Sequence, residues 1–381
     1  MKAKLLTLLS LIGFTFLAQS QEISKGVMRL NELRKPACRE IINIPDVNGY
    51  KVLKCDFHTH TVFSDGFVWP TIRAQEAWQE GLDAMALTEH VEYHPFKDFI
   101  EVNHNRSYEL IEEVSKKNNV ILIKGTEITR QTPPGHFNAI FIGDALSYIE
   151  DNASEKDEEA IMKAVEQNAF IFWNHPGWRP AIEGSYEWLP FIEDLHKKNA
   201  LHGIEVINGF GFHMKALDWC VDKGLTVMGT SDIHNLVEHD YDRSKDYVHR
   251  TMTLVMAKER TPESIREALN AGRTVAWASK YLAGKEENVK NLFNACVKLL
   301  PSHFSQENRD GTKTNFYEIQ NNSDLYFELE LTAGKGTQKI TLYPMSSQLI
   351  SAEAGQSSLS YDVINAYVRS DKYLNISFSL Q

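Results

Sequence analysis

The chain has 381 residues, of which 43% are hydrophobic and 24% charged, and a formal net charge of -11 at pH 7. This composition predicts a folded globular protein, and the length suits one large domain with a smaller second one. The acidic balance argues against a nucleic-acid partner, because binding to backbone phosphates requires clustered Lys and Arg. None of the four cysteines belongs to a CxxC pair, so a thiolate zinc site is not expected.

The first 20 residues have the layout of a secretory signal peptide. Lys2 and Lys4 precede an apolar run from Leu5 to Ala18, and Ala18-Gln19-Ser20 is a small-x-small cleavage pattern. The run is too short and wrongly flanked for a stable membrane span. We therefore expect residues 1–20 to be removed and the mature protein to be periplasmic or secreted, without membrane contact. A retained N-terminal anchor is the alternative.

Residues 21–50 are predicted to form an N-terminal arm and not a core element. An exported location permits disulfides, and the sequence leaves open whether Cys38 pairs with Cys55. Because Cys55 lies within an apolar run, we expect it to be a small core residue.

Residues 51–300 alternate short apolar runs with longer helical patterns. The pattern from Pro70 to Glu80 has Pro near its start and Gly81 just past its end, as helices commonly do. Strands separated by helices of this length predict parallel βα units and an α/β barrel of about seven strands. Seven predicted strands cover residues 52–57, 84–87, 121–125, 137–142, 169–173, 203–207 and 225–229, and the last barrel-side strands cover 252–257 and 274–278. Further helices are predicted at 101–117, 155–167, 186–198 and 213–223, and from Thr261 to Gly272.

Side chains that suit metal binding stand at the ends of these predicted strands. His58 and His60 are two residues apart, so on an extended chain their imidazoles face the same way, and Asp65 follows in a Ser-Asp-Gly turn. The later strands lead to His90, Glu127, His175, Asp232 and His234, and His136 begins the apolar run at 137–142. In an α/β barrel the carboxyl ends of the strands form the active site. The pattern therefore predicts a metal site at that end, and core histidines with solvated acids are the alternative.

The composition of the chain and the spacing of its apolar residues change after residue 300. Residues 301–314 are polar, without an apolar period, and are predicted to be a linker. Residues 315–381 contain strict alternation, with Leu325, Phe327, Leu329 and Leu331 separated by polar or charged side chains. This predicts a small antiparallel β domain, resembling a β-sandwich, with a packing role. Carbohydrate binding is the alternative role.

Six segments of the chain resemble one known family. HTHTVFSDG, LTEH, GTEIT, GHFNAI, NHPG and GTSDIH are similar, in this order, to the motifs of the PHP (polymerase and histidinol phosphatase) family of metal-dependent phosphoesterases. The resemblance covers roughly residues 50–280 and is closest to the secreted bacterial Sb-PDE-type phosphodiesterases. It implies a distorted (β/α)7 TIM-like barrel, the PHP fold, which suits the predicted strand count.

The resemblance also implies nine metal ligands that bind three divalent transition-metal ions. The first ion takes His58, His60, Glu127 and Asp232. The second shares Glu127 and adds His136 and His175, and the third takes Asp65, His90 and His234. Asp65 stands where some family members have histidine. Imidazole with carboxylate ligands suits Zn, Mn or Fe, and the sequence does not choose among them.

These ligands predict phosphoester hydrolysis by a metal-bound hydroxide that attacks in line. A carboxylate such as Glu127 can bridge two cations, and a water held by them loses its proton near neutral pH. Glu127 and Asp232 are thus expected to be catalytic, and Arg179 is predicted to clamp a phosphate oxygen. Weaker assignments are Arg250 as a second phosphate ligand, His202 as a proton donor, Glu205 and Asn208 as residues that hold the ligands, and Trp69, Trp173 and Trp178 as pocket walls.

The predicted substrate is a small organic phosphodiester. A phosphomonoesterase of the histidinol-phosphatase type is the first alternative, although export disfavours a cytoplasmic biosynthetic substrate. A metal amidohydrolase also begins with two histidines on a barrel strand, but usually bridges its metals with a modified lysine where this chain offers Glu127. If the chain were a non-catalytic metal-binding module, some of the nine ligand positions should lack a ligand side chain, and none does. The sequence does not specify the oligomeric state.

Overall fold

The computed structural model describes residues 26–33, 37–145, 157–179 and 186–380. The predicted signal peptide lies outside these residues. The chain divides into two units after Cys38, and the second unit contains every element discussed below. In the first unit, the described part of the predicted arm has an exposed 3-10 turn at Asn31–Leu33. Among the described residues, no helix has the length and apolar character needed to cross a bilayer.

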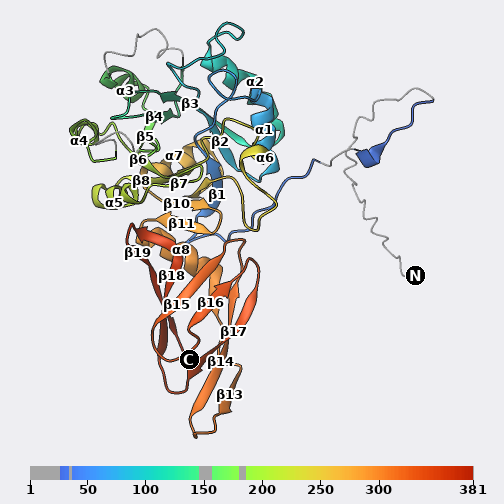
Figure 1. Cartoon of the computed structure of the whole chain (residues 1–381), viewed down its shortest axis with the longest axis vertical. Helices are drawn as coiled ribbons and strands as arrows, with labels where there is room; N and C mark the ends of the chain where they lie inside the picture. The colour runs from blue at the N-terminus through green and yellow to red at the C-terminus, as the bar shows by residue number, and fades with distance from the viewer. Residues whose placement is uncertain (1–25, 34–36, 146–156, 180–185, 381) are drawn as a thin grey trace, which may run out of the picture. The chain divides into compact units, whose positions relative to one another are not determined.

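The larger part of the second unit is an α/β barrel (Figure 1). In hydrogen-bonded order its wall runs β1, β2, β3, β4, β5, β6 and β8, and β9 and β10 lie beyond β1. Thr253 Oγ1 donates to Gly229 O at 2.6 Å, and Thr274 Oγ1 donates to Val227 O at 2.7 Å, so β8 meets β9 and β10 through side chains. The strands are β1 (Lys51–Asp56), β2 (Ala84–Leu87), β3 (Ile121–Ile128), β4 (Phe137–Ile140), β5 (Phe170–Trp173), β6 (Gly203–Asn208), β7 (Gly211–Phe212), β8 (Thr226–Thr230), β9 (Met252–Ala257), β10 (Thr274–Ala278) and β11 (Tyr281–Gly284).

The barrel class is confirmed, and the expectation of parallel βα units holds for part of the wall but is wrong at β4 and β9. β1–β2, β2–β3, β5–β6 and β6–β8 are parallel pairs, whereas β4 is antiparallel to both β3 and β5. Only residues 129–136 connect β3 to β4, without a helix, and such a short connection can only join antiparallel strands. β9 is also antiparallel to β1 and β10.

Helices cover the outside of the barrel strands (Figure 1). α1, α4 and α7 each begin with proline in the first turn, where its missing N–H costs nothing. α2 begins at His104, later than predicted, because the Asn103 side chain caps it by accepting from Arg106 N. The helices are α1 (Pro70–Gln79), α2 (His104–Lys117), α3 (Asp157–Glu166), α4 (Pro190–Lys197), α5 (Met214–Lys223), α6 (Val237–Asp240), α7 (Pro262–Asn270) and α8 (Glu286–Cys296).

The C-terminal part is a sandwich of two antiparallel sheets, as the alternation predicts. One sheet contains β12, β13, β14 and β17, and the other contains β15, β16, β18 and β19. The strands are β12 (Val297–Leu299), β13 (Phe304–Glu307), β14 (Lys313–Asn321), β15 (Phe327–Ala333), β16 (Lys339–Leu342), β17 (Ser347–Glu353), β18 (Ser358–Arg369) and β19 (Lys372–Ser379).

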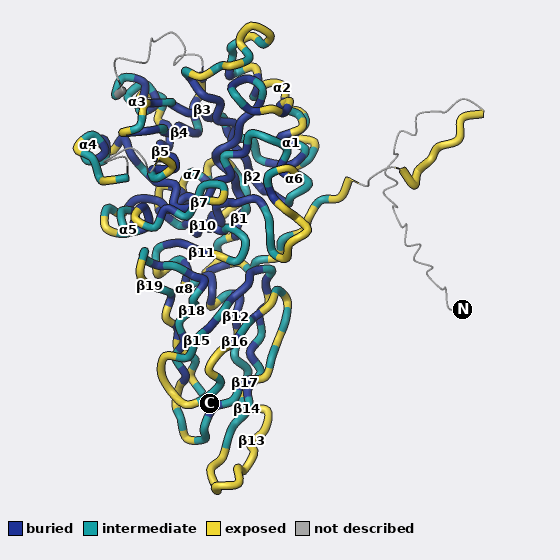
Figure 2. The backbone as a smooth tube through the Cα atoms, viewed as in Figure 1, coloured by how far each residue is buried: buried dark blue, intermediate teal, exposed yellow. Residues whose placement is uncertain are grey.

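The predicted linker at residues 301–314 is wrong. β13 lies within it and pairs with the start of β14 in a hairpin. Every residue of β13 is exposed, and Figure 2 shows this hairpin as the most exposed part of the sandwich. A strand without a buried face needs no apolar alternation, so the pattern carried no strand signal there.

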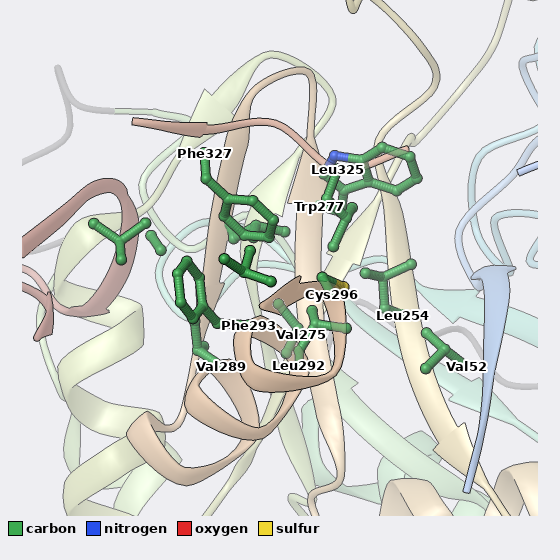
Figure 3. Close-up of a cluster of buried hydrophobic side chains, with 14 of the residues drawn as sticks. Val52, Leu254, Val275, Trp277, Val289, Leu292, Phe293, Cys296, Leu325 and Phe327 are labelled. Carbon is green, nitrogen blue, oxygen red and sulfur yellow. The ribbon is translucent and has the colours of Figure 1, made fainter. Parts of the chain in front are cut away.

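The barrel and the sandwich share one apolar core. β11 of the barrel pairs in parallel with β18 of the sandwich, which makes their sheets continuous. Figure 3 shows the side chains gathered around α8, where Phe293 meets Phe327 with ring centroids 5.0 Å apart. Cys296 belongs to this core, and Cys55 is fully buried and free in β1. The core thus supports the packing role expected of the β domain.

Candidate metal centre

His58 and His60 form the floor of the predicted site. Both follow β1, where the extended chain continues alongside the segment after β8: His60 N donates to Ile233 O at 3.1 Å, and Asp232 N donates to His58 O at 2.9 Å. Both imidazoles are fully buried, and their Nε2 atoms lie 3.0 Å apart. The extended backbone therefore aims two nitrogens at one point, as the two-residue spacing predicts.

Two carboxylates converge on the same point. Asp232 Oδ1 lies 3.1 Å from Nε2 of both His58 and His60. Glu127 Oε2, at the end of β3, lies 3.1 Å from His58 Nε2 and 3.2 Å from His60 Nε2. These four residues are the set that the resemblance assigns to the first metal.

Glu127 also faces a second group of ligands. Its Oε1 lies 2.9 Å from His136 Nδ1 and 3.6 Å from His175 Nε2, and its Oε2 lies 3.1 Å from His90 Nδ1. The carboxylate therefore stands between two sets of imidazoles, as a bridging ligand must. His90 lies closer to this second group than the resemblance implies.

The third predicted group is centred on Asp65. Its Oδ1 lies 3.1 Å from His234 Nε2, 3.5 Å from His90 Nε2 and 3.8 Å from His60 Nδ1. All nine predicted ligands are thus brought together. Within them, three groups have ligand atoms no more than 4.8 Å apart: His58, His60 and Asp232; His90, Glu127 and His136; and His60, Asp65, His90 and His234.

Two of the ligands have backbone angles in the left-handed region, His175 with φ 25° and Asp232 with φ 52°. Residues other than glycine rarely adopt this conformation, which costs roughly 1–3 kcal/mol and persists at functional sites held by their surroundings. Here the His175 N–H donates to Glu205 Oε2 at 2.8 Å, and the Asp232 N–H is fixed by His58 O.

The electrostatics of the cluster fit divalent cations. Burial by itself lowers the pKa of His60, but its hydrogen bonds to Asp232 and Glu127 outweigh burial and raise the pKa to about 10. Burial likewise opposes protonation of His58, yet Asp232, Glu127 and Glu205 raise its pKa well above the ordinary value. Burial by itself raises the pKa of Glu127 and Asp232. The surrounding histidines lower it by more than burial raises it, so the net shift of both pKa values is downward. Positive charge is therefore strongly favoured among these atoms, and a bound metal would take the place of the protons.

Glu205 on β6 holds the ligands from behind. It is fully buried, and its Oε1 accepts from His58 Nδ1 at 2.7 Å and from Thr230 Oγ1 at 2.6 Å. Its Oε2 accepts from the His175 N–H and from Asn208 Nδ2, both at 2.8 Å. Asn208 Nδ2 also lies 3.4 Å from Asp232 Oδ2. The predicted holding role of Glu205 and Asn208 agrees with these contacts.

Two further buried carboxylates hold the site, and the sequence analysis missed them. Asp56 accepts from Ser231 N at 3.1 Å and from His58 N at 3.3 Å, and so joins the two ligand segments. Glu89 accepts from Ser64 Oγ at 2.6 Å, and Ser64 Oγ lies 3.3 Å from His60 Nδ1. The available signal was an acid one or two residues before a ligand histidine, Glu89 before His90 and Asp56 before His58.

Arg250 does not serve as a phosphate ligand, which was the weaker of the two interpretations of this residue. Its side chain is fully buried, with NH1 3.4 Å from Asp56 Oδ2 and Nε 2.8 Å from Glu80 Oε2. It therefore neutralises buried carboxylates behind the site. His202 also lies away from the ligands: its Nδ1 accepts from Ile171 N at 2.9 Å, at the start of β6.

A cavity of about 630 Å³ opens above the ligands, and Arg179, the residue predicted to clamp a phosphate oxygen, is among those that line it. Its other lining residues include Tyr93, Trp178, Glu92 and Asn208. The other two predicted walls are absent from the cavity lining. Trp173 is fully buried and donates to Pro134 O at 2.9 Å, and Trp69 packs on Phe63 with centroids 5.8 Å apart.

Comparison with known proteins matches both parts of the chain. A family model for an Ig-like domain matches residues 297–379. A crystal structure from Bacteroides vulgatus, described as a two-domain protein containing a predicted PHP-like metal-dependent phosphoesterase, is 42% identical. It covers 91% of this chain and 100% of its own, with a TM-score of 0.84.

Two other similarities are weaker or shorter. A candidate metal-dependent phosphoesterase from Bifidobacterium adolescentis is 16% identical over 57% of this chain and 96% of its own, with a TM-score of 0.39. An uncharacterized protein of Methanocaldococcus jannaschii is 35% identical over 82 residues, or 21% of this chain. The chain spans 36% of the length of that relative.

Proposed function

The chain belongs to the PHP-like metal-dependent phosphoesterases, and from this membership we propose that it hydrolyses small organic phosphodiesters with three divalent transition-metal ions. The observation that supports this most is the convergence of nine imidazole and carboxylate side chains at one mouth of the barrel: eight in the three groups, and His175 beside Glu127 and Asp232. The proposed ions are Zn, Mn or Fe, since mixed nitrogen and oxygen ligands suit all three. The proposed relation to the Sb-PDE-type diesterases rests on the sequence motifs.

The residues of the chain have distinct proposed roles in this reaction. Bound divalent cations supply an activated water and positive charge against the phosphoryl oxygens. Glu127, between two sets of imidazoles, fixes the separation of the first two groups. Asp232 completes the first group with His58 and His60. Arg179, at the cavity rim, offers a guanidinium whose planar fork suits a phosphoryl oxygen.

The charge of the cavity favours a diester over a monoester. Arg179 is the only Lys or Arg among the described residues that line it, and Glu92 adds a carboxylate to the wall. A diester carries one negative charge near neutral pH, whereas a monoester approaches two. The proposed cations would carry most of the positive charge of the site, and Glu92 is paired with Arg130. Outside the cations, Arg179 alone would remain to offset the second negative charge of a monoester, so the monoanion suits this wall better.

The test compares bis(p-nitrophenyl) phosphate with p-nitrophenyl phosphate on the protein loaded with Mn, Zn or Fe. We expect faster turnover of the diester, measured as kcat/KM at equal metal concentration. Faster turnover of the monoester would support the phosphomonoesterase alternative. Turnover of neither ester with any of the three metals would contradict phosphoester hydrolysis altogether.

We also propose that the protein is exported, on the layout of residues 1–20. Expression of the full chain in a Gram-negative host, followed by fractionation and N-terminal sequencing, tests this. The expected result is a periplasmic or secreted product that begins at or near Gln21. A cytoplasmic product that retains Met1 would contradict it.

A further inference from the structure

Aromatic side chains stand on two sides of the ligand cluster at the cavity mouth. Tyr93 packs beside His90, with ring centroids 6.0 Å apart and planes at 77°. Trp178 packs beside His175 at 5.5 Å and beside His136 at 6.0 Å. All of these rings line the cavity. The mouth therefore presents aromatic surface directly against the metal ligands.

The two aromatic residues belong to different walls. His90 and His136 lie next to each other, with centroids 5.7 Å apart, and the ring contacts run in the order Tyr93, His90, His136, Trp178. A phosphoryl group bound over His90 and His136 would thus have Tyr93 near one end of this row and Trp178 near the other. Each end can contact a separate substituent of the phosphorus.

Both walls keep their rings accessible. Tyr93 is 53% exposed and Trp178 is 45% exposed, although each contacts a buried ligand histidine. The Arg179 guanidinium lies over the Trp178 ring, with Cζ 4.4 Å from its centroid, which adds a flat, positively charged surface to that wall. Flat aromatic surfaces favour flat organic groups, because ring pairs gain free energy beyond the burial of their area.

From this arrangement we infer that the enzyme selects phosphodiesters in which both substituents carry a flat ring, one ring against Tyr93 and the other against Trp178 and Arg179. The inference rests on the proposed diesterase function and names its substrate class. A monoester has one organic group and would leave one wall unused. A dialkyl ester would occupy both ends without the ring contacts.

Calorimetric binding of three diesters to the metal-loaded protein tests this inference: dimethyl, methyl phenyl and diphenyl phosphate. Each added ring should tighten Kd by about three- to tenfold, the range expected for an aromatic contact. Y93A and W178A should each weaken diphenyl phosphate by about that factor and leave dimethyl phosphate unchanged. The aromatic replacements Y93F and W178F should retain the preference for rings.

Matched controls lie elsewhere on the chain. Trp69 is also 45% exposed and Tyr281 is 50% exposed, and neither lines this cavity. W69A and Y281A should leave all three affinities unchanged.

Equal affinity for the dimethyl and diphenyl esters, or equal losses in the control variants, would overturn the inference. If bis(p-nitrophenyl) phosphate is hydrolysed while the ring preference is absent, the inference fails and the proposed function stands. If nothing is hydrolysed but each wall variant weakens diphenyl phosphate as expected, the proposed function fails and the aromatic walls stand.

Discussion

The mouth of the barrel and the core between barrel and sandwich are both buried, but they are built in opposite ways. At the mouth, imidazoles and carboxylates are buried side by side, and the buried acids Asp56, Glu89 and Glu205 hold them. Around α8, the shared core is built mainly of apolar side chains such as Leu292, Phe293 and Phe327.

This difference separates activity from stability. Burying polar groups has a free-energy cost unless each finds a partner, so the mouth depends on specific contacts and on bound cations. Burying apolar groups is favourable in proportion to area, so the shared core stabilises both domains. Changes at the mouth should affect turnover and metal affinity, whereas changes around α8 should affect the free energy of unfolding.

The largest effect is expected for Glu127→Gln. The substitution keeps the side-chain size but removes the negative charge that faces His58, His60, His90 and His136. We expect kcat/KM for bis(p-nitrophenyl) phosphate to fall by about 10³-fold, in the range for loss of a preorganised charge. The far-UV circular dichroism spectrum should stay unchanged. The surface variant Glu353→Gln should keep full activity, and an active Glu127→Gln enzyme would contradict the ligand assignment.

The second prediction concerns the shared core. Leu292 on α8 is 1% exposed, and its replacement by alanine should lower the free energy of unfolding by about 2–5 kcal/mol. Urea unfolding at a fixed metal concentration measures this. Leu349, on the exposed side of β17, provides the control, since its truncation should change stability by less than about 0.5 kcal/mol. A Leu292→Ala protein that keeps its free energy of unfolding but loses kcat/KM would contradict the proposed separation of roles.

A smaller effect is expected for Glu205→Ala. Glu205 holds His58 Nδ1 and the His175 N–H but belongs to none of the three ligand groups. Loss of such a holding residue should weaken metal binding by about 10- to 100-fold. Competition with a chelator measures the affinity, and excess metal should recover much of the activity. Glu205→Gln keeps one acceptor oxygen, which can serve two of the four donors that face Glu205, and should lose less. Equal losses would show that the charge matters more than the remaining hydrogen bonds.

The smallest effect is expected at the surface between the two domains. Arg369 NH2 on β18 lies 2.7 Å from Asp222 Oδ1 on α5, and both side chains are largely exposed. An exposed ion pair contributes about 0.2–1 kcal/mol and is screened by salt. Arg369→Ala should therefore shift the urea midpoint slightly at low salt and not at 1 M NaCl. A loss comparable to that of Leu292→Ala would mean that charge, and not the apolar core, joins the domains.

The sequence predicted the ligands better than it predicted the residues that hold them. His58, His60 and the strand-end residues are identifiable because strand alternation and barrel topology bring such positions together. Asp56 and Arg250 are 194 residues apart, and nothing local indicates that they pair. The weaker interpretation of Arg250 as a phosphate ligand therefore stayed open in the sequence, although buried carboxylates neutralise its charge.

The errors in the fold have similar local causes. The antiparallel β4 follows from a connection without a helix, a signal that was present in residues 129–136 but was outweighed by the barrel pattern. The β13 strand gave no signal, because neither of its faces is buried. The β15 strand was predicted correctly, since one of its faces packs into the core and imposes a period of two.

The most direct test of the account is elemental analysis of the purified protein after loading with Mn, Zn or Fe and removal of free metal. The account predicts three ions per chain, with fewer in Glu127→Gln. A protein that retains less than one ion per chain, and shows no metal dependence of any phosphoester hydrolysis, would contradict the claim that these nine side chains form a metal centre.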